Sequence, residues 1–207
     1  MGEVKKSLRA ERAGVTRRRI AETARTLFAV RGYGATTLQA IADEAGVAVQ
    51  TVYAVYRSKP GILRALRESA VHQPEAGALY DAAIRESNPR RKIELFARSV
   101  RHRWEYGYDI VAVHEQAGRT DRSVSKEVEK VLAIRRNGIA RLAQTFGSQF
   151  DRARATAILD ALTVPEVYKE LVEISGWTPD EYETWLARAL RQQLLPSSRR
   201  PSRSDAR

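Results

Sequence analysis

The side chains that most often perform chemistry are few in this 207-residue sequence, and their spacing does not favour catalysis. There is no cysteine, so thiolate chemistry and disulfide bonds are excluded by composition. The histidines His72, His102 and His114 are separated by 30 and 12 residues, unlike the close pairs of compact metal motifs. We therefore predict no catalytic residue, no metal-binding residue and no cofactor.

A cluster of carboxylates near the C-terminal end invites an acid–base interpretation. Asp180, Glu181 and Glu183 follow Thr178 and Pro179, however, and Thr178 with Glu181 fits a capping box. Carboxylates in a first helical turn also complement the positive end of the helix dipole. We expect this cluster to start the last helix, and we do not expect an enzyme.

Polar side chains near the N-terminal end indicate a different chemistry, the recognition of DNA. Residues 37–57 contain two short helical patterns separated by a tight turn at Ala45-Gly46-Val47. This arrangement is typical of a helix-turn-helix, whose second helix enters the major groove while the first supports it. Val49, Gln50 and Thr51 open the second helix, and residues at this end of a recognition helix face base edges. Gln50 is the best candidate, because an amide can form a bidentate pair with adenine.

Two threonines precede the first of these short helices. Thr36 and Thr37 lie where the amides and hydroxyls of a helix start can meet a phosphate. Thr36 with Gln39 also fits the S/T-x-x-E/Q capping box. The two residues could therefore serve as caps and nothing else.

Helical periodicity covers most of the chain, and no stretch has the period of a strand. The first helix is expected to begin at Thr16 and to end at Gly32, after a run of residues 1–15 that lacks apolar periodicity. A later helix should be bent or interrupted at Pro165, because proline removes a backbone donor. The remaining helices are expected over residues 38–45, 49–56, 59 onward, 75–86, 89–115, 123–146, 151–174 and 179–194.

The positive charge is concentrated at the two ends of the chain. The net charge is +11 overall, and residues 1–60 carry eleven Lys/Arg against five Asp/Glu, which gives +6. The last twelve residues carry four against one, which gives +3, so the central part contributes only +2. A front end that binds a polyanion explains this distribution, although a general preference for arginine remains an alternative.

The N-terminal quarter resembles the TetR/AcrR family of regulators, with a dense match over residues 17–65. A looser likeness extends to the closing segment, residues 162–195. The matching residues are Phe28, Gly32, Thr36-Thr37, Ile41-Ala42, Ala45-Gly46-Val47, Thr51, Tyr53, Tyr56, Ser58-Lys59 and Leu63.

The resemblance implies an all-α subunit with three DNA-binding helices and a larger regulatory domain. It implies phosphate contacts from Thr51, Tyr53 and Lys59, and a homodimer formed mainly by the last two helices. Two departures from the family remove polar contacts, because Ala48 and Val55 stand where members carry a small polar residue and histidine. Operator affinity would then depend more on the basic residues of the N-terminal arm and on Arg17, Arg18 and Arg19.

A ligand pocket in this family lies among the middle helices, and no motif marks it here. The candidates are Trp104, Tyr108, His114 and Glu115 on the long central helix; Trp104 and Tyr108 are four residues apart and share a face. Aromatic residues at helical spacing are more often core residues, and that alternative stays open. Few fixed charges accompany these aromatics, so the expected effector is partly apolar.

These patterns predict an all-α fold with an N-terminal helix-turn-helix domain and a C-terminal helical ligand-binding and dimerisation domain. The expected divisions are a disordered basic arm (1–15), the DNA-binding domain (16–62), the regulatory domain (63–195) and a disordered basic tail (196–207). We expect a cytoplasmic homodimer without membrane contact that binds double-stranded operator DNA and is released by an unknown small-molecule effector. The alternative is a sequence-nonspecific, nucleoid-type protein. The sequence does not name the effector, the operator or the regulated genes, nor does it decide between repression and activation.

Overall fold

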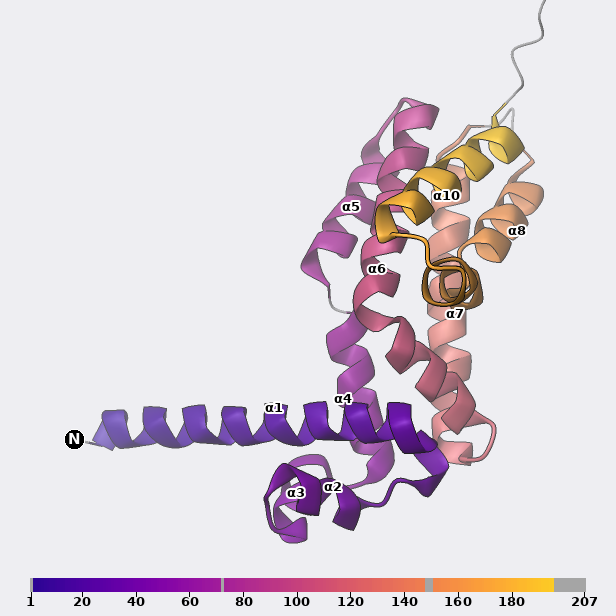
Figure 1. The fold of residues 1–207 in the computed structure, drawn as a ribbon. Coiled ribbons are helices and arrows are strands. Elements are labelled where there is room, and N and C mark those ends of the chain that lie inside the picture. Colours follow the sequence, from indigo (N-terminus) through magenta and orange to yellow (C-terminus); the bar gives the residue numbers. More distant parts are fainter. Residues whose placement is uncertain (1, 72, 148–150, 196–207) are drawn as a thin grey trace, which may run out of the picture. The chain divides into compact units, whose positions relative to one another are not determined.

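The computed structural model describes residues 2–71, 73–147 and 151–195, and every regular element in these ranges is helical (Figure 1). The predicted all-α fold is confirmed. No helix in the described part of the chain is long and apolar enough to cross a membrane. The elements are α1 (Gly2–Ala35), α2 (Leu38–Ala45), α3 (Val49–Tyr56), α4 (Lys59–Val71), α5 (Pro74–Arg85), α6 (Pro89–Gly118), α7 (Arg122–Gln144), α8 (Arg152–Leu162), α9 (Pro165–Tyr168), the π-helix η1 (Lys169–Ile174) and α10 (Pro179–Leu194).

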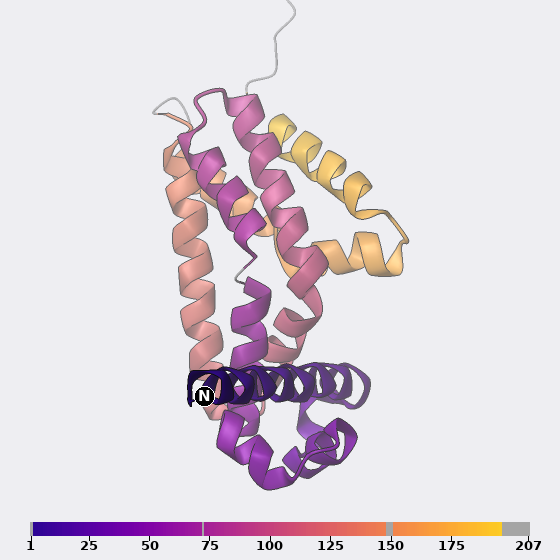
Figure 2. The same cartoon turned by 90° about the vertical axis from the view of Figure 1, so that its left-hand side faces the viewer.

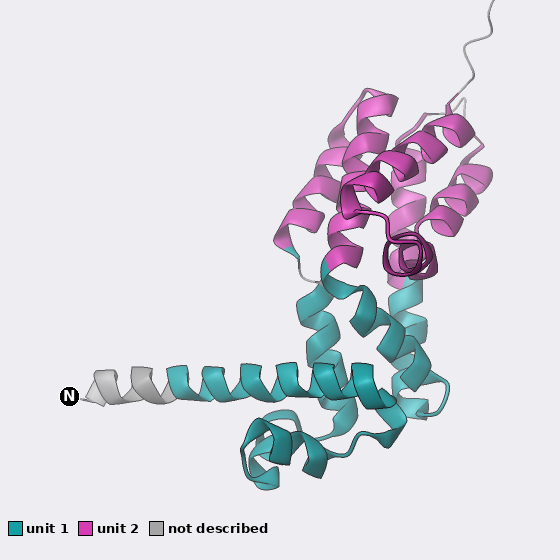
Figure 3. Cartoon of the chain, in the orientation of Figure 1, with its two compact units in different colours: residues 1–73, 106–133 teal, residues 74–105, 134–207 magenta. Residues whose placement is uncertain are grey.

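The chain folds as two compact units (Figure 3). Unit 1 comprises residues 1–73 and 106–133, and unit 2 comprises residues 74–105 and 134–207. Helices α6 and α7 therefore contribute residues to both units. This division reflects how closely the helices pack and not what they do. The predicted boundary between a DNA-binding domain and a regulatory domain, between residues 62 and 63, therefore stays a prediction. The predicted tail, residues 196–207, lies outside the described residues.

Helix α1 begins at Gly2, and the predicted start at Thr16 is wrong. Residues 2–15 have no apolar periodicity, but Ala, Leu, Lys, Arg and Glu provide most of them and favour helix intrinsically. Periodicity reports burial of one helix face, and a solvated helix does not need it. The helix breaks at Gly32, which has φ 79° and ψ 157°, a conformation that is essentially restricted to glycine.

The core of unit 1 is formed where α1, α2, α3 and α4 meet. The side chains of Phe28, Ile41, Val52 and Leu63, one from each of these helices, are all buried in it. Both views show α2 and α3 on the same side of α1 (Figures 1 and 2). The apolar faces predicted for the first helices thus pack together, and they hold α3 against the rest of unit 1.

In unit 2, α5 and the first half of α6 run side by side. Ser99 Oγ donates to the carbonyl oxygen of Ala76 at 2.7 Å, and Lys92 Nζ donates to that of Ala83 at 3.2 Å. Lys92 Nζ also donates to Thr145 Oγ1, just beyond the end of α7, at 2.7 Å, so this buried ammonium has several oxygen partners.

The last helix begins as the sequence predicts. Thr178 Oγ1 accepts from the Glu181 amide at 3.2 Å, and Glu181 Oε2 accepts from the Thr178 amide at 2.7 Å, which completes the capping box. The predicted interruption of the preceding helical segment at Pro165 is confirmed, because α8 ends at Leu162 and Pro165 starts the separate helix α9.

The apolar stripe of α10 is mostly buried within unit 2 itself. Tyr182, Leu186 and Leu190 are each fully buried, and the Tyr182 ring packs edge-on against Tyr168 with centroids 5.0 Å apart. Only Trp185 of this stripe keeps part of its surface exposed. Burial inside one subunit therefore accounts for most of this surface.

The backbone of α4 packs closely against the end of α3 at Gly61. A Cβ atom there would collide with the backbone carbonyl of Tyr56, whereas a Cβ at Gly77 of α5 would meet nothing within 4 Å. We expect Gly61→Ala to lower the melting temperature of the protein, because backbone has to move. Gly77→Ala should instead stabilise it by about 1 kcal/mol, since alanine has the higher helix propensity. Equal melting temperatures for the two variants would contradict this account.

Candidate nucleic-acid interface

The turn between α2 and α3 is closed by a left-handed glycine. Gly46 has φ 62° and ψ 43°, and its amide donates to the Asp43 carbonyl at 3.1 Å. The next amide, of Val47, donates to the Ala42 carbonyl at 3.0 Å. Glycine adopts this conformation without a Cβ penalty, so only three residues separate the end of α2 from the start of α3.

Helix α3 has a buried side and an open side. Val52 and Tyr56 are buried, and Val49 is partly buried against the same core. On the open side, Gln50 is exposed and Tyr53 is 52% exposed, one turn apart along the helix. Gln50 and Tyr53 can therefore contact a partner together, while Val49 contributes less to that face than the sequence predicts.

The start of α3 lacks a side-chain cap. Ala48 is the N-cap residue and forms no side-chain hydrogen bond, as its methyl group requires. The Thr51 amide donates to the Ala48 carbonyl at 2.8 Å, but the amides of Val49 and Gln50 have no side-chain cap, and Thr51 itself is half-exposed. Free amides at a helix start favour an anion such as a phosphate.

The two threonines before α2 have different roles. Thr37 is the N-cap, and its Oγ1 accepts from the Ala40 amide at 3.0 Å, so the predicted capping box of Thr36 and Gln39 is wrong. Thr36 is 0% exposed, and its hydroxyl lies 2.8 Å from the Gly32 carbonyl, to which it donates. Its side chain closes the end of α1 and does not reach a phosphate. The exposed Thr37 keeps its hydroxyl proton for a partner.

Lys59 is directed into unit 1. Its Nζ donates to the carbonyl oxygens of Tyr33 at 2.7 Å, Thr36 at 2.9 Å and Gly34 at 3.3 Å, and it lies 4.3 Å from the centre of the Tyr33 ring. A lysine ammonium has three donors, and these three carbonyls use all of them. Partial burial lowers the pKa of Lys59. This geometry disagrees with the phosphate contact that the resemblance implies.

Tyr56 links α3 to the basic part of α1. Its hydroxyl donates to the backbone carbonyl of Arg17 at 2.8 Å, and the Arg17 guanidinium lies 4.9 Å from the centre of its ring. Arg17, Arg18 and Arg19 are all exposed. Tyr56 is itself buried in the core of unit 1, and its hydrogen bond to Arg17 could not be read from the sequence.

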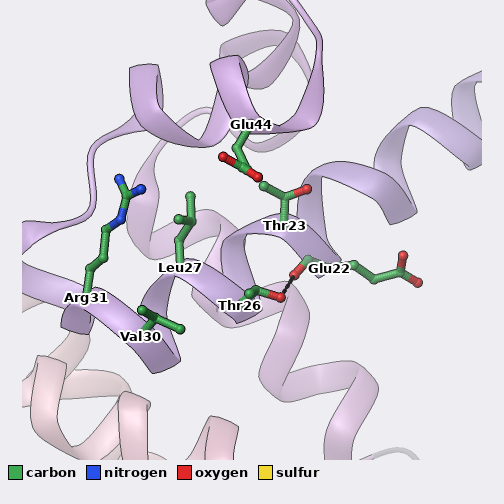
Figure 4. Close-up of a pocket in the computed structure, with 7 residues that line it drawn as sticks. All are labelled: Glu22, Thr23, Thr26, Leu27, Val30, Arg31 and Glu44. Carbon is green, nitrogen blue, oxygen red and sulfur yellow. Dashed lines mark hydrogen bonds between the residues drawn. The ribbon is translucent and has the colours of Figure 1, made fainter.

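A groove of about 390 Å³ lies between α1 and α2 and is distinct from the open side of α3 (Figure 4). Leu27 and the exposed Val30 provide its apolar part, and Arg31 lies at one edge. The carboxylates of Glu22 and Glu44 also line it, and they would repel a phosphate. We do not include this groove in the interface.

The four predicted ligand-binding residues are divided between the units. Trp104 belongs to unit 2, where its indole is buried and donates to the Thr163 carbonyl at 3.2 Å, as a core residue does. Tyr108 belongs to unit 1 and is half-buried. His114 and Glu115 line one small cavity of unit 1 together with Arg67, which sequence reasoning missed. Arg67 lies on another helix, and no sequence spacing could connect it with His114.

No group of three or more His, Cys, Asp or Glu side chains that could hold a metal ion occurs among the described residues. The arrangement of unit 1 is that of a helix-turn-helix with one exposed, partly polar helix face.

Comparison with known proteins agrees with this geometry. Residues 20–66 match the family model described as bacterial regulatory proteins, tetR family. The helix-turn-helix segment of the chain is therefore similar to that of tetR-family regulators. A search of curated proteins gave no match.

Several solved structures share the fold of this chain. The fatty acid degradation regulator FadR from Bacillus halodurans is 16% identical, with a TM-score of 0.65, over 84% of this chain and 94% of its own. The regulator PfmR from Thermus thermophilus is 21% identical, with a TM-score of 0.63, over 88% and 97%. The ketosteroid regulator KstR2 of Mycobacterium tuberculosis is 18% identical, with a TM-score of 0.66, over 86% and 94%. At these identities the likeness establishes the fold.

The position of Lys59 can be tested without DNA. Because Lys59→Met leaves three carbonyl oxygens without their donor, we expect it to destabilise folding by about 1–3 kcal/mol. Denaturant unfolding of this variant beside Lys126→Met, an exposed lysine of α7, measures the difference. If Lys59→Met left the free energy of unfolding unchanged and reduced the salt dependence of DNA binding, Lys59 would instead be a phosphate contact.

Proposed function

We propose that the protein is a dimeric repressor that binds operator DNA through α3 and leaves it when a small molecule binds. The exposed face of α3 carries this proposal, because it combines an amide that can read bases with a hydroxyl that can hold a phosphate. Gln50 is the proposed base reader, and Thr37, Thr51 and Tyr53 are the proposed phosphate contacts. The side chains of Thr36 and Lys59 are not among the proposed DNA contacts, because both donate to backbone carbonyls of unit 1.

A basic helix supports the DNA contact. Residues 2–19 of α1 carry seven Lys or Arg against two Glu, a net charge of +5. The bond between Tyr56 and Arg17 fixes the position of this helix relative to α3. We propose that it contributes sequence-independent phosphate contacts and so offsets the polar groups missing at Ala48 and Val55.

We propose a homodimer in which unit 2 contributes the contact surface. The buried side of α10 is already occupied, so the contact falls to residues that stay open, such as the exposed Ile174 and the half-exposed Trp177 and Trp185. The two indole rings pack edge-on with centroids 6.2 Å apart and form one apolar surface. Two recognition helices about 34–36 Å apart would then enter successive major grooves.

The effector is proposed to be mainly apolar. Two proteins with this fold are named as a fatty acid degradation regulator and as a ketosteroid regulator, which supports that class. We propose no enzymatic activity and no cofactor. Cytoplasmic location also stays a prediction.

A nonspecific, nucleoid-type DNA-binding protein remains the second candidate because of the basic ends of the chain. The two candidates differ in one observable. A repressor protects a discrete site, whereas the affinity of a nonspecific protein is the same for all sequences and falls uniformly with salt.

Substitution of Gln50 tests the proposed base contact. With operator DNA selected from genomic fragments, Gln50→Ala should lose about 1–3 kcal/mol of discrimination at one base pair of each half-site. Fluorescence anisotropy on the operator and on single-base variants measures this loss, and Gln116→Ala on α6 serves as control. If wild-type protein bound shuffled DNA as tightly as the selected fragments, the repressor proposal would be wrong.

The contribution of α1 is separable by its salt dependence. Replacing its four N-terminal basic residues Lys5, Lys6, Arg9 and Arg12 by Gln should weaken binding to all DNA sequences alike. The slope of log affinity against log salt should shrink by about 0.9 for each phosphate that the variant no longer neutralises.

The matched control replaces four exposed basic residues of α7 by Gln, namely Lys126, Lys130, Arg136 and Arg141. The same change of slope in both variants would mean that total charge, and not the placement of charge on α1, determines affinity.

A further inference from the structure

Two buried nitrogen atoms of unit 1 have no hydrogen-bond partner among the described residues. They are Nε of Arg67 on α4 and Nε2 of His114 on α6, and His114 is only 3% exposed. Both residues line one cavity of about 20 Å³. Buried polar atoms are nearly always hydrogen-bonded, so two such atoms at one cavity call for a physical explanation.

The donor chemistry of the cavity is determined by Arg67. A guanidinium is always protonated and carries donors only, so a partner for its Nε must be an acceptor. Burial, and then the positive charge of Arg67, lower the pKa of His114 against the raising effect of Glu127, so the neutral imidazole is favoured. A neutral imidazole with its proton on Nε2 is a second donor to the same acceptor.

The charges around the cavity disfavour an anion. Glu127 of α7 already pairs with Arg64 of α4, and its Oε2 lies 3.8 Å from His114 Nε2. Glu68 lies 3.9 Å from a terminal nitrogen of Arg67, and Glu115 is part of the wall. The arginines are therefore balanced by carboxylates, and an uncharged acceptor suits the site better than a second anion.

The rest of the wall is apolar. It consists of four aliphatic side chains from α6 and α7, all of them partly buried: Val111, Val128, Val131 and Leu132.

We propose that this cavity receives a carbonyl or hydroxyl oxygen of an uncharged, mainly apolar effector. The oxygen accepts from Arg67 Nε and His114 Nε2, and the carbon skeleton separates the four aliphatic side chains as it enters. The inference rests on the proposed ligand response and specifies the polar end of the effector.

The position of Arg67 explains how such contact reaches the DNA-binding helices. Helix α4 begins at Lys59, three residues after α3 ends at Tyr56, and its Leu63 and Leu66 belong to the core of unit 1. A ligand that binds Arg67 thus acts on a helix that packs directly against the helix-turn-helix.

Matched probes test the proposal in the full-length protein. Isothermal titration with octan-2-one, octanoate and shorter methyl ketones compares an uncharged acceptor with an anion of equal length. We expect octan-2-one to bind at least tenfold more tightly than octanoate, with ketone affinity rising about fourfold per methylene. Arg67→Met and His114→Phe should each weaken the ketone at least tenfold, while Arg136→Met, an exposed residue of α7, should not.

A spectroscopic measurement reports on the site itself. With only three histidines in the chain, the ring ¹⁵N signals of His114 can be assigned with the His114→Phe variant. Addition of octan-2-one should shift the Nε2 signal in wild-type protein and not in Arg67→Met.

Three outcomes would overturn the inference: no binding of any probe, as for a site that holds a buried water only; tighter binding of octanoate; or ketone binding that both substitutions leave intact. Operator binding, measured for the same variants, distinguishes failure of the proposed effector site from failure of the repressor proposal. If the variants bind operator DNA and still release it with another effector, the repressor proposal stands and this site is wrong.

Discussion

The interaction on which unit 1 depends is the contact of one ammonium group with the end of α1. The helix breaks at Gly32, and the break leaves backbone carbonyls without their helical partners. Lys59, the first residue of α4, donates to three of the carbonyls between Tyr33 and Thr36. A charge-assisted donor is roughly twice as strong as a neutral one, so this contact joins the end of α1, the start of α2 and the start of α4.

The exposed face of α3 follows from that junction. Once α1, α2 and α4 are fixed, Val52 and Tyr56 occupy the space between them, and the opposite side of α3 has to face solvent. Gln50 and Tyr53 lie on that side because of their spacing from the buried residues. The buried apolar residues of α3 thus position the proposed recognition residues Gln50 and Tyr53. The Tyr56 hydroxyl, which donates to the Arg17 carbonyl, also holds α1 in place beside α3.

The sequence predicted those features that depend on local patterns. Apolar periodicity located the helix-turn-helix, and cap chemistry located the start of α10 at Thr178. It missed the N-terminal start of α1, because a solvated helix leaves no apolar stripe. It offered both Thr36 and Thr37 as caps of α2 and could not decide between them, and only Thr37 caps the helix. It also could not place Lys59 on the carbonyls of α1 or Arg67 beside His114. Both contacts join helices that are distant in sequence, and only tertiary packing decides them.

Unit 1 contains both the proposed DNA-binding helices and the cavity at Arg67. The free energy that a ligand must contribute to affect DNA binding can therefore be compared with the energy of a single contact at Arg67. Coupling between two sites of a regulator is typically about 1–3 kcal/mol. A single hydrogen bond to a charged group is worth about 1.5–3 kcal/mol, the same order. In the proposed function, one acceptor oxygen on Arg67, bound better in one arrangement of α4 than in another, would therefore be enough to change operator occupancy. The apolar remainder of such an effector would then contribute most of the affinity through burial of its surface.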